Sequence, residues 1–356
     1  MSARPDILKI TTTERRKLMA HDLENQNGKT SFASFREPAW HGLGTVFTEE
    51  KNTTEMLEAA NLNGWNVRLQ DMEIPSTLTS DKSYQYVLRT NPTNNTQTDV
   101  LGIVGERYVP LQNEDLFSFG DNILDGGGRW ETAGSIKGGR VVFGALALER
   151  ETVLDPNGVA DKVKTYLLIN TSHDGSIAIQ ASITPVRVVC ANTLNLALNR
   201  TKKKDGVKQS FKIRHTQTAN GKVQIARETL GMANKYMDEF DIMAKAMIEK
   251  TVDAKMFNDI ILAAYPKPDA DAKGSFKKWE NKIDMINDIY TGEFNGMIAG
   301  NAWGAFNALT ERLDWYRSAR GGSNESILAS ASGFDPAINA EKNRLLKVVQ
   351  NTLQLV

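Results

Sequence analysis

The sequence predicts an α+β protein with an antiparallel, strand-rich N-terminal domain, containing hairpins and short helices, followed by a helical C-terminal part. Apolar side chains alternate with a period of two through much of residues 65–190, whereas from residue 230 onward they recur every three or four positions. The chain of 356 residues is long enough for about two domains. We expect a polar leader at 1–18 that is compatible with disorder, a strand-rich core at 19–215 and a helical region at 216–356.

The strand-rich part begins with a short helix and then continues mostly as strands. The helix is expected over 53–62, with Thr53 as its N-cap and Gly64 as its stop. A second helix is expected over 111–124. The expected strands cover 65–70, 84–88, 100–104, 130–136, 141–148, 164–170, 176–183 and 186–190.

Turn signals separate several of these strands. Residues 91–98 are rich in Asn, Thr and Pro and predict a turn. Lys137-Gly138-Gly139-Arg140 predicts a hairpin, and His173-Asp174-Gly175 predicts a further turn. Asn192 can cap a short helix over 193–199.

The C-terminal part shows helical periodicity. Apolar stripes predict helices over 230–247, 276–290, 302–316 and about 338–355. These stripes can pack on one another within one chain or leave a face for a second copy. Because a neutral protein with methionine-rich helices associates readily, we expect a homo-oligomer.

The composition indicates the cellular setting. A single cysteine, Cys190, excludes an internal disulfide and favours a reducing, cytoplasmic compartment. No segment approaches the roughly 18 consecutive apolar residues that a membrane helix requires. We therefore expect no membrane partner.

Charge is balanced overall but unevenly distributed. The chain has 43 Lys and Arg against 43 Asp and Glu. Residues 200–227 contain nine Lys and Arg and one acid, Asp205, so this basic strip carries +8 and the rest of the chain −8. Such a strip is typical of a nucleic-acid-binding face or of a solvated loop. The sequence leaves both interpretations open.

No catalytic constellation is recognisable. The four histidines lie far apart, and no zinc-ligand spacing is present. Cys190 lies in an apolar segment where a buried thiol is the usual state. The glycines at 126–128 lack the spacing of a nucleotide-binding loop. We expect no metal, no cofactor and no enzymatic activity, with a dispersed active site as the alternative.

Cations beside glycines and aromatics are the candidates for nucleic-acid contact. Lys137 and Arg140 flank two glycines at a hairpin tip, and Arg129 with Trp130 follows three glycines, where a phosphate can approach and a base can stack. The full set of candidate contact residues is Arg129, Trp130, Lys137, Arg140, Arg187, Lys202, Lys203, Lys204, Lys208, Lys212, Arg214 and His215.

Several motifs are similar to those of a known family. They are Met19–Asp22, Ser31–Ser34, Pro38–Thr45 with its Trp40-His41-Gly42-Leu43-Gly44-Thr45 core, Thr184–Leu194 and Lys212–Thr216. Together they resemble the phage/plasmid-like family with a Leu-Gly-Thr signature, a domain of unknown function (932). The resemblance covers roughly 19–320 and implies a setting in phages, prophages or plasmids rather than an activity.

These observations lead to an ordered set of functional expectations. The first is a phage- or plasmid-encoded protein that binds single-stranded DNA and anneals it without a nucleotide, in recombination or replication. Its strand, hairpin and helix pattern with a basic strip resembles single-strand annealing recombinases in architecture only. The second is a non-catalytic interaction protein that binds or inhibits a host component. The third is an enzyme with a dispersed active site.

Overall fold

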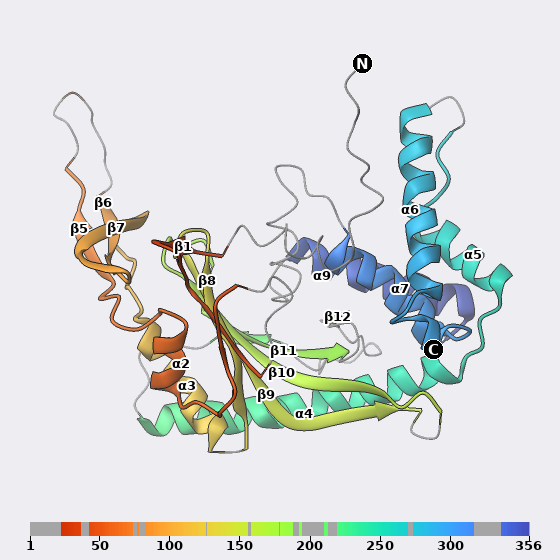
Figure 1. The fold of residues 1–356 in the computed structure, drawn as a ribbon, viewed down its shortest axis with the longest axis horizontal. Helices are drawn as coiled ribbons and strands as arrows, with labels where there is room; N and C mark the ends of the chain where they lie inside the picture. Colours follow the sequence, from red (N-terminus) through yellow and green to blue (C-terminus); the bar gives the residue numbers. More distant parts are fainter. Residues whose placement is uncertain are drawn as a thin grey trace. The chain divides into compact units, whose positions relative to one another are not determined.

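The computed structural model describes residues 23–36, 43–73, 77, 83–125, 127–155, 158–177, 179–187, 192–193, 210–212, 219–269, 273–316 and 336–355. It confirms the predicted fold class, because antiparallel strands and short helices are followed by a helical C-terminal part (Figure 1). The strands are β1 Asn25–Gln26, β2 Lys29–Thr30, β3 Phe32–Phe35, β4 Thr45–Phe47, β5 Arg68–Asp71, β6 Tyr84–Asn91, β7 Asn94–Gly105, β8 Arg129–Ile136, β9 Val141–Leu154, β10 Asp161–Ser172, β11 Gln180–Arg187, β12 Asn192–Thr193 and β13 Ser210–Lys212. The helices are α2 Thr53–Ala59, α3 Asn113–Leu124, α4 Ala219–Glu249, α5 Ala254–Ala264, α6 Lys273–Thr291, η2 Gly296–Ile298, α7 Ala302–Trp315 and α9 Pro336–Leu353.

The described chain divides into two compact units. Unit 1 comprises 1–147, 168–182 and 210–228, and unit 2 comprises 148–167, 183–209 and 229–356. The strands β9, β10 and β11 and the helix α4 each contribute residues to both units. The predicted boundary between 215 and 216 remains a prediction.

An eight-stranded sheet runs in the order β12-β11-β10-β9-β8-β3-β4, with β13 also paired to β11. The predicted hairpin at 137–140 is present, and its register places Ile136 opposite Val141. A register shift between Trp130 and Thr132 interrupts the β8–β9 pairing. β3 pairs in parallel with β4 and antiparallel with β8.

A second, three-stranded antiparallel sheet has the order β5-β6-β7. Its strands replace the predicted long turn at 91–98, because β7 already begins at Asn94. The side chain of Asn91 accepts hydrogen bonds from the backbone amides of Thr93 and Asn94, both 2.9–3.0 Å away, and so closes a tight turn. The first strand begins at Arg68 rather than at Trp65.

Helices α2 and α3 pack beside β8 in unit 1. The N-cap of α2 is Asn52 rather than the predicted Thr53, and it forms a reciprocal capping box with Glu55. Trp130 lies between the helices: its Nε1 donates to Thr53 Oγ1 at 3.0 Å, and its ring centroid lies 4.9 Å from that of Phe117. A side chain at Gly120 would overlap the Trp130 ring, so the close approach of α3 requires this glycine.

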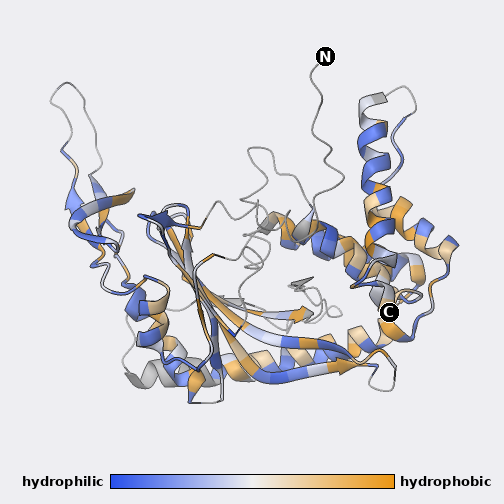
Figure 2. Ribbon diagram, viewed as in Figure 1, coloured by the Kyte–Doolittle hydropathy of each residue, from blue (hydrophilic) through white to orange (hydrophobic). Residues whose placement is uncertain are grey.

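The helices of unit 2 include one that the sequence reading missed. The predicted helices at 276–290, 302–316 and 338–355 correspond to α6, α7 and α9, and 230–247 lies within α4. Helix α5 was not predicted, although Asp253 caps it and its buried stripe has helical spacing. Figure 2 shows α6 as mostly hydrophilic along its length, whereas α5 carries broad hydrophobic stretches.

One predicted helix is wrong in its first residue. Asn192 and Thr193 form β12 and pair with Arg187 and Val186 of β11, so strand pairing takes the place of the expected cap. The remainder of that prediction, 194–199, lies outside the described residues, as does the leader 1–18. No helix in the described part of the chain is long and apolar enough to cross a membrane.

Candidate nucleic-acid interface

Two tight turns of unit 1 meet at one end of the large sheet. The β8–β9 turn spans 137–140, and the turn between β10 and β11 spans 173–177. The backbone amide of His173 donates to the carbonyl oxygen of Arg140 at 2.7 Å and joins the two turns. We call this region the turn end.

Three predicted cations belong to the turn end. Lys137 and Arg140 are exposed on the first turn. Lys212 pairs with Gln180, the first residue of β11 after the second turn. The β-sheet therefore gathers residues that are up to 75 positions apart in sequence (212 minus 137) at the same edge.

The first turn is held by a buried arginine. Lys137, Gly138 and Gly139 have φ values of 56°, 65° and 84°, so the turn uses the left-handed region that favours glycine. A Cβ at Gly139 would overlap Nη1 of Arg89, whereas one at Gly138 would meet nothing within 4 Å. Gly139 is thus the point at which the turn rests on the guanidinium.

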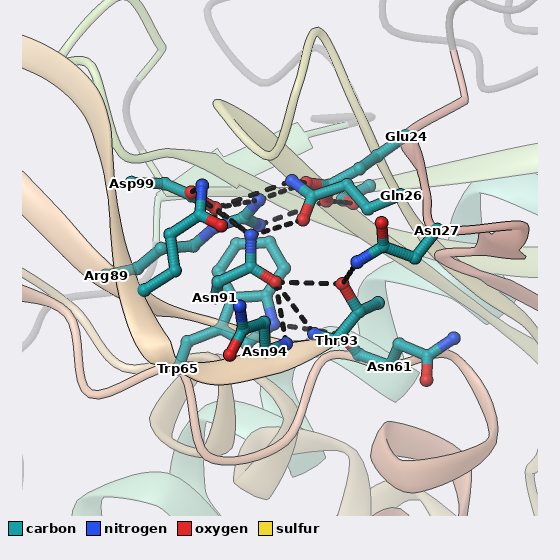
Figure 3. A network of polar contacts seen from close by, with 12 residues as sticks. Glu24, Gln26, Asn27, Asn61, Trp65, Arg89, Asn91, Thr93, Asn94 and Asp99 are labelled. Carbon is teal, nitrogen blue, oxygen red and sulfur yellow. Dashed lines mark hydrogen bonds and ion pairs between the residues drawn. The ribbon is translucent and has the colours of Figure 1, made fainter.

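Arg89 is fully buried on β6 and forms ion pairs with two carboxylates (Figure 3). Its Nη1 donates to Glu24 Oε2 at 3.0 Å, and its Nη2 also pairs with Glu24. Its Nε and Nη2 donate to Asp99 Oδ2 at 3.1 and 3.0 Å. The guanidinium carbon lies 4.1 Å from the ring centroid of Trp65. The ion pairs of the guanidinium with Glu24 and Asp99, together with the Trp65 indole, hold Arg89 in a fixed position beneath the turn.

Neighbouring polar side chains complete the network. Ser135 Oγ donates to Glu24 Oε2 at 2.6 Å, and Gln26 Nε2 donates to Glu24 Oε1 at 2.8 Å. Asn91 Nδ2 donates to both oxygens of Asp99 at 3.1 Å and also bonds to Gln26 (Figure 3). The network joins the N-terminal segment to the β6–β7 hairpin and to β8, and its donors and acceptors satisfy one another. We assign it a positioning role rather than a chemical one.

His173 is the first residue of the second turn, and its side chain is fully buried. Asn113 donates to the carbonyl oxygen of Leu62 through Nδ2, so its Oδ1 accepts a hydrogen bond from His173 Nε2 at 2.9 Å. The Trp65 ring lies 5.6 Å from the imidazole, centroid to centroid. Burial and the positive charge of Arg89 lower the pKa of His173 to about 4, so the imidazole is neutral at physiological pH.

This buried histidine predicts acid sensitivity. An unfolded histidine takes up a proton below a pKa of about 6.5, whereas folded His173 does so only near pH 4. Stability is therefore lost as pH falls from about 6.5 to 4, by on the order of 2–3 kcal/mol from this group. We expect His173→Gln to remove most of that decline. Urea midpoints of both proteins at pH 7 and pH 4.5 measure it, and equal declines would contradict the prediction.

Tyr108, in the loop that follows β7, contacts the start of the second turn, and Asp174 lies within that turn. Tyr108 Oη donates to the carbonyl oxygen of Ser172 at 3.2 Å, and burial with the nearby charge of Asp174 raises the pKa of Tyr108 to about 12. Burial opposes ionisation of Asp174, but hydrogen bonds from Ser176 and Ser172 and the charge of Arg140 lower its pKa overall. Asp174 thus stays anionic and partly offsets Arg140 at the turn end.

The other described candidates do not join this group. Arg129 and Trp130 begin β8, whereas the turn lies at its other end, roughly 23 Å away for seven residue steps. The interpretation of Trp130 as an exposed stacking ring is wrong, because it is 1% exposed and packs under α2 and α3. The Arg129 Nε atom lies 3.4 Å from Glu131 Oε2, and the guanidinium lies over Phe35. Both residues therefore have structural contacts.

Arg187 is the last residue of β11, where it pairs with Asn192. The remaining candidates lie outside the described residues: Lys202, Lys203, Lys204, Lys208, Arg214 and His215, together with Trp40, His41 and Gly42 of the Trp40 motif. The described residues contain no cluster of three or more His, Cys, Asp or Glu side chains able to hold a metal ion.

The sequence reading missed Arg89, which positions the turn. A signal was present: Val87, Arg89 and Asn91 share one face of a strand whose apolar member is buried. A charged residue in such a position requires buried partners. Those partners, Glu24 and Asp99, come from other segments and carry no pattern that links them to it.

Comparison with known proteins identifies the family. The sequence profile described as domain of unknown function (DUF932) matches residues 100–332. The match covers more than half of the chain, and the protein therefore belongs to this family. The matched range includes both turns of the turn end and excludes the Trp40 motif. No curated protein and no solved structure matches the chain.

Proposed function

We propose that this protein binds nucleic acid, with single-stranded DNA as its ligand and the turn end as part of the interface. The observation that carries the proposal is the placement of Lys137, Arg140 and Lys212 at one end of the sheet in a chain of zero net charge. Exposed cations at glycine turns neutralise phosphates without reading sequence. The basic strip at 200–227 contains Lys212 and supplies further cations on both sides of it in the sequence.

The finer proposal is annealing of single strands for recombination or replication of a phage or plasmid, without a nucleotide cofactor. Three features support it: successive antiparallel strands, a hairpin with cationic flanks, and a 31-residue helix that follows them. Annealing proteins work as assemblies, and we propose a homo-oligomer on the same grounds. We also propose a cytoplasmic location, because a protein with a single cysteine has no internal disulfide and suits a reducing compartment.

Salt dependence of oligonucleotide binding tests the interface. For single strands the log–log slope is about −0.7 per phosphate contact, so four to six contacts give roughly −3 to −4. Replacing Lys137 and Arg140 together with Gln should make that slope less steep by about 1.4 and weaken binding to all sequences about equally. Replacing Lys202, Lys203, Lys204 and Lys208 with Glu should make the salt slope still less steep.

A matched control removes the same charge elsewhere. Lys245 and Lys255 are exposed on α4 and α5, and their joint replacement by Gln should leave the slope unchanged. Fluorescence anisotropy of a labelled oligonucleotide from low to physiological salt supplies the measurement. An absence of binding by the wild type at low salt and tens of micromolar protein would refute the nucleic-acid proposal.

A specific observation favours the interaction protein as the second candidate. Val100 and Ile103 on β7 and Val109 in the following loop are 58%, 52% and 66% exposed. β7 is an edge strand of its three-stranded sheet, so its backbone can pair with a further strand. Exposed apolar side chains on an edge strand are typical of protein contact sites.

A further inference from the structure

Three cations surround one tyrosine in unit 2. Tyr265 ends α5 and is 9% exposed. Lys282 Nζ lies 4.5 Å from its ring centroid, and the guanidinium carbons of Arg312 and Arg344 lie 5.4 and 5.7 Å away. The three cations come from α6, α7 and α9, so the packing of four helices gathers them. We call Tyr265 and these three residues the Tyr265 cluster.

The positive charge of the cluster exceeds the negative charge that faces it. Glu341 forms a bidentate pair with Arg344 through two 2.8 Å hydrogen bonds. The C-terminus of α5 adds about half a negative charge, and Arg344 also donates to the carbonyl oxygen of Ala264 at 3.0 Å. Three positive charges thus face about one and a half negative ones. Lys282 and Arg312 form no ion pair within the described part of the chain.

The excess has a measurable consequence at Lys282. Partial burial has the largest effect and lowers the pKa of this amine, the charge of Arg312 lowers it further, and the charges of Glu341 and Arg344 then act in opposite directions. Helix capping alone requires one cation at a helix C-terminus, not three. A bound anion would relieve the mutual repulsion of these side chains.

Half-buried aromatic rings adjoin the cluster. Phe276 and Trp279 on α6 have ring centroids 5.8 Å apart, and Lys267 Nζ lies 5.3 and 5.9 Å from them. Trp279 Nε1 donates to the carbonyl oxygen of Tyr265 at 2.8 Å, which fixes the indole beside the cluster. Cations next to partly exposed rings are the combination that binds a phosphate with an attached base.

We propose that the Tyr265 cluster binds a phosphoryl group. Arg312 presents a forked guanidinium and Lys282 a point-like amine, which match the oxygens of a phosphate, while Arg344, whose fork is held by Glu341, adds positive charge. The same chemistry occurs in the phosphodiester backbone of nucleic acid and in free phosphate or a mononucleotide. The site uses residues of unit 2 alone and does not require that the turn end binds DNA.

Replacement of Lys282 by Gln tests the site with inorganic phosphate as the probe. At constant ionic strength set with chloride, phosphate should raise the melting temperature of the full-length wild type, because it binds the folded state. In Lys282→Gln the phosphate affinity should fall at least about ten-fold. Its melting temperature without phosphate should stay equal or rise, since a repelling charge is gone. The control Lys277→Gln, on an exposed face of α6, should behave as wild type.

A second arm identifies the source of the phosphoryl group. Displacement of phosphate by a short single-stranded oligonucleotide supports a backbone phosphate, and binding of phosphate without displacement supports a small phosphorylated compound. No phosphate response in the wild type, or an equal response in Lys282→Gln, overturns the proposal. If phosphate binds here but no oligonucleotide binds anywhere, the site stands and the proposed function fails. If oligonucleotides bind the wild type and Lys282→Gln responds to phosphate as the wild type does, the proposed function stands and the phosphoryl site fails.

Discussion

Arg89→Met is expected to lower the free energy of unfolding by about 4 kcal/mol, because it leaves two carboxylates without their cation. Glu24 is buried and Asp99 is mostly so, and Arg89 supplies four hydrogen bonds to them. Methionine fills a similar volume, so the loss reflects charge and hydrogen bonding rather than a cavity. Urea unfolding together with hydrogen exchange of peptides from β6 and β8 measures the loss in unit 1.

Two companion variants separate charge burial from simple loss of an arginine. Arg129→Met removes an arginine from the partly exposed pair with Glu131 and should cost less than about 1 kcal/mol. Adding Glu24→Gln to Arg89→Met removes one buried carboxylate charge that has lost its cation, and should recover part of the lost free energy of unfolding. An Arg89→Met protein as stable as Arg129→Met would show that the network contributes little to the fold.

The sequence was sufficient for the fold class and for most of the elements. Alternating apolar residues predict β8 and β9, and helical stripes predict α6, α7 and α9, because both periodicities record which face is buried. Boundaries were less predictable. β9 continues to Leu154 past its predicted end, where burial still alternates but one buried position, Thr152, has a polar side chain and so gives no apolar signal.

The candidate interface was predictable only in part. Exposed Lys137 and Arg140 follow from a local turn signal, since glycines at a hairpin tip leave flanking side chains in solvent. The burial of Trp130 did not follow, because it depends on Gly120 and Phe117 of a helix that precedes it. The Tyr265 cluster depends on four helices meeting, and nothing in the spacing of its residues indicates that they meet.

The glycine pair at the hairpin tip provides the last test, since both members have a positive φ but differ in surroundings. Both have positive φ, 65° at Gly138 and 84° at Gly139, so alanine at either position costs about 1 kcal/mol in backbone strain. Only at Gly139 would the added methyl group overlap the Arg89 guanidinium, which four hydrogen bonds hold in place. Overpacking of a rigid site costs a further 1–3 kcal/mol or so.

We therefore expect Gly139→Ala to lower the free energy of unfolding by about 3 kcal/mol and Gly138→Ala by about 1 kcal/mol. Urea midpoints give both values. Arg89→Met combined with Gly139→Ala should show less than the sum of the single losses, because the methionine side chain no longer holds a charged fork against the turn. Equal losses in the two alanine variants would mean that the turn does not rest on Arg89. The position of Lys137 and Arg140 would then depend on the strand pairing alone.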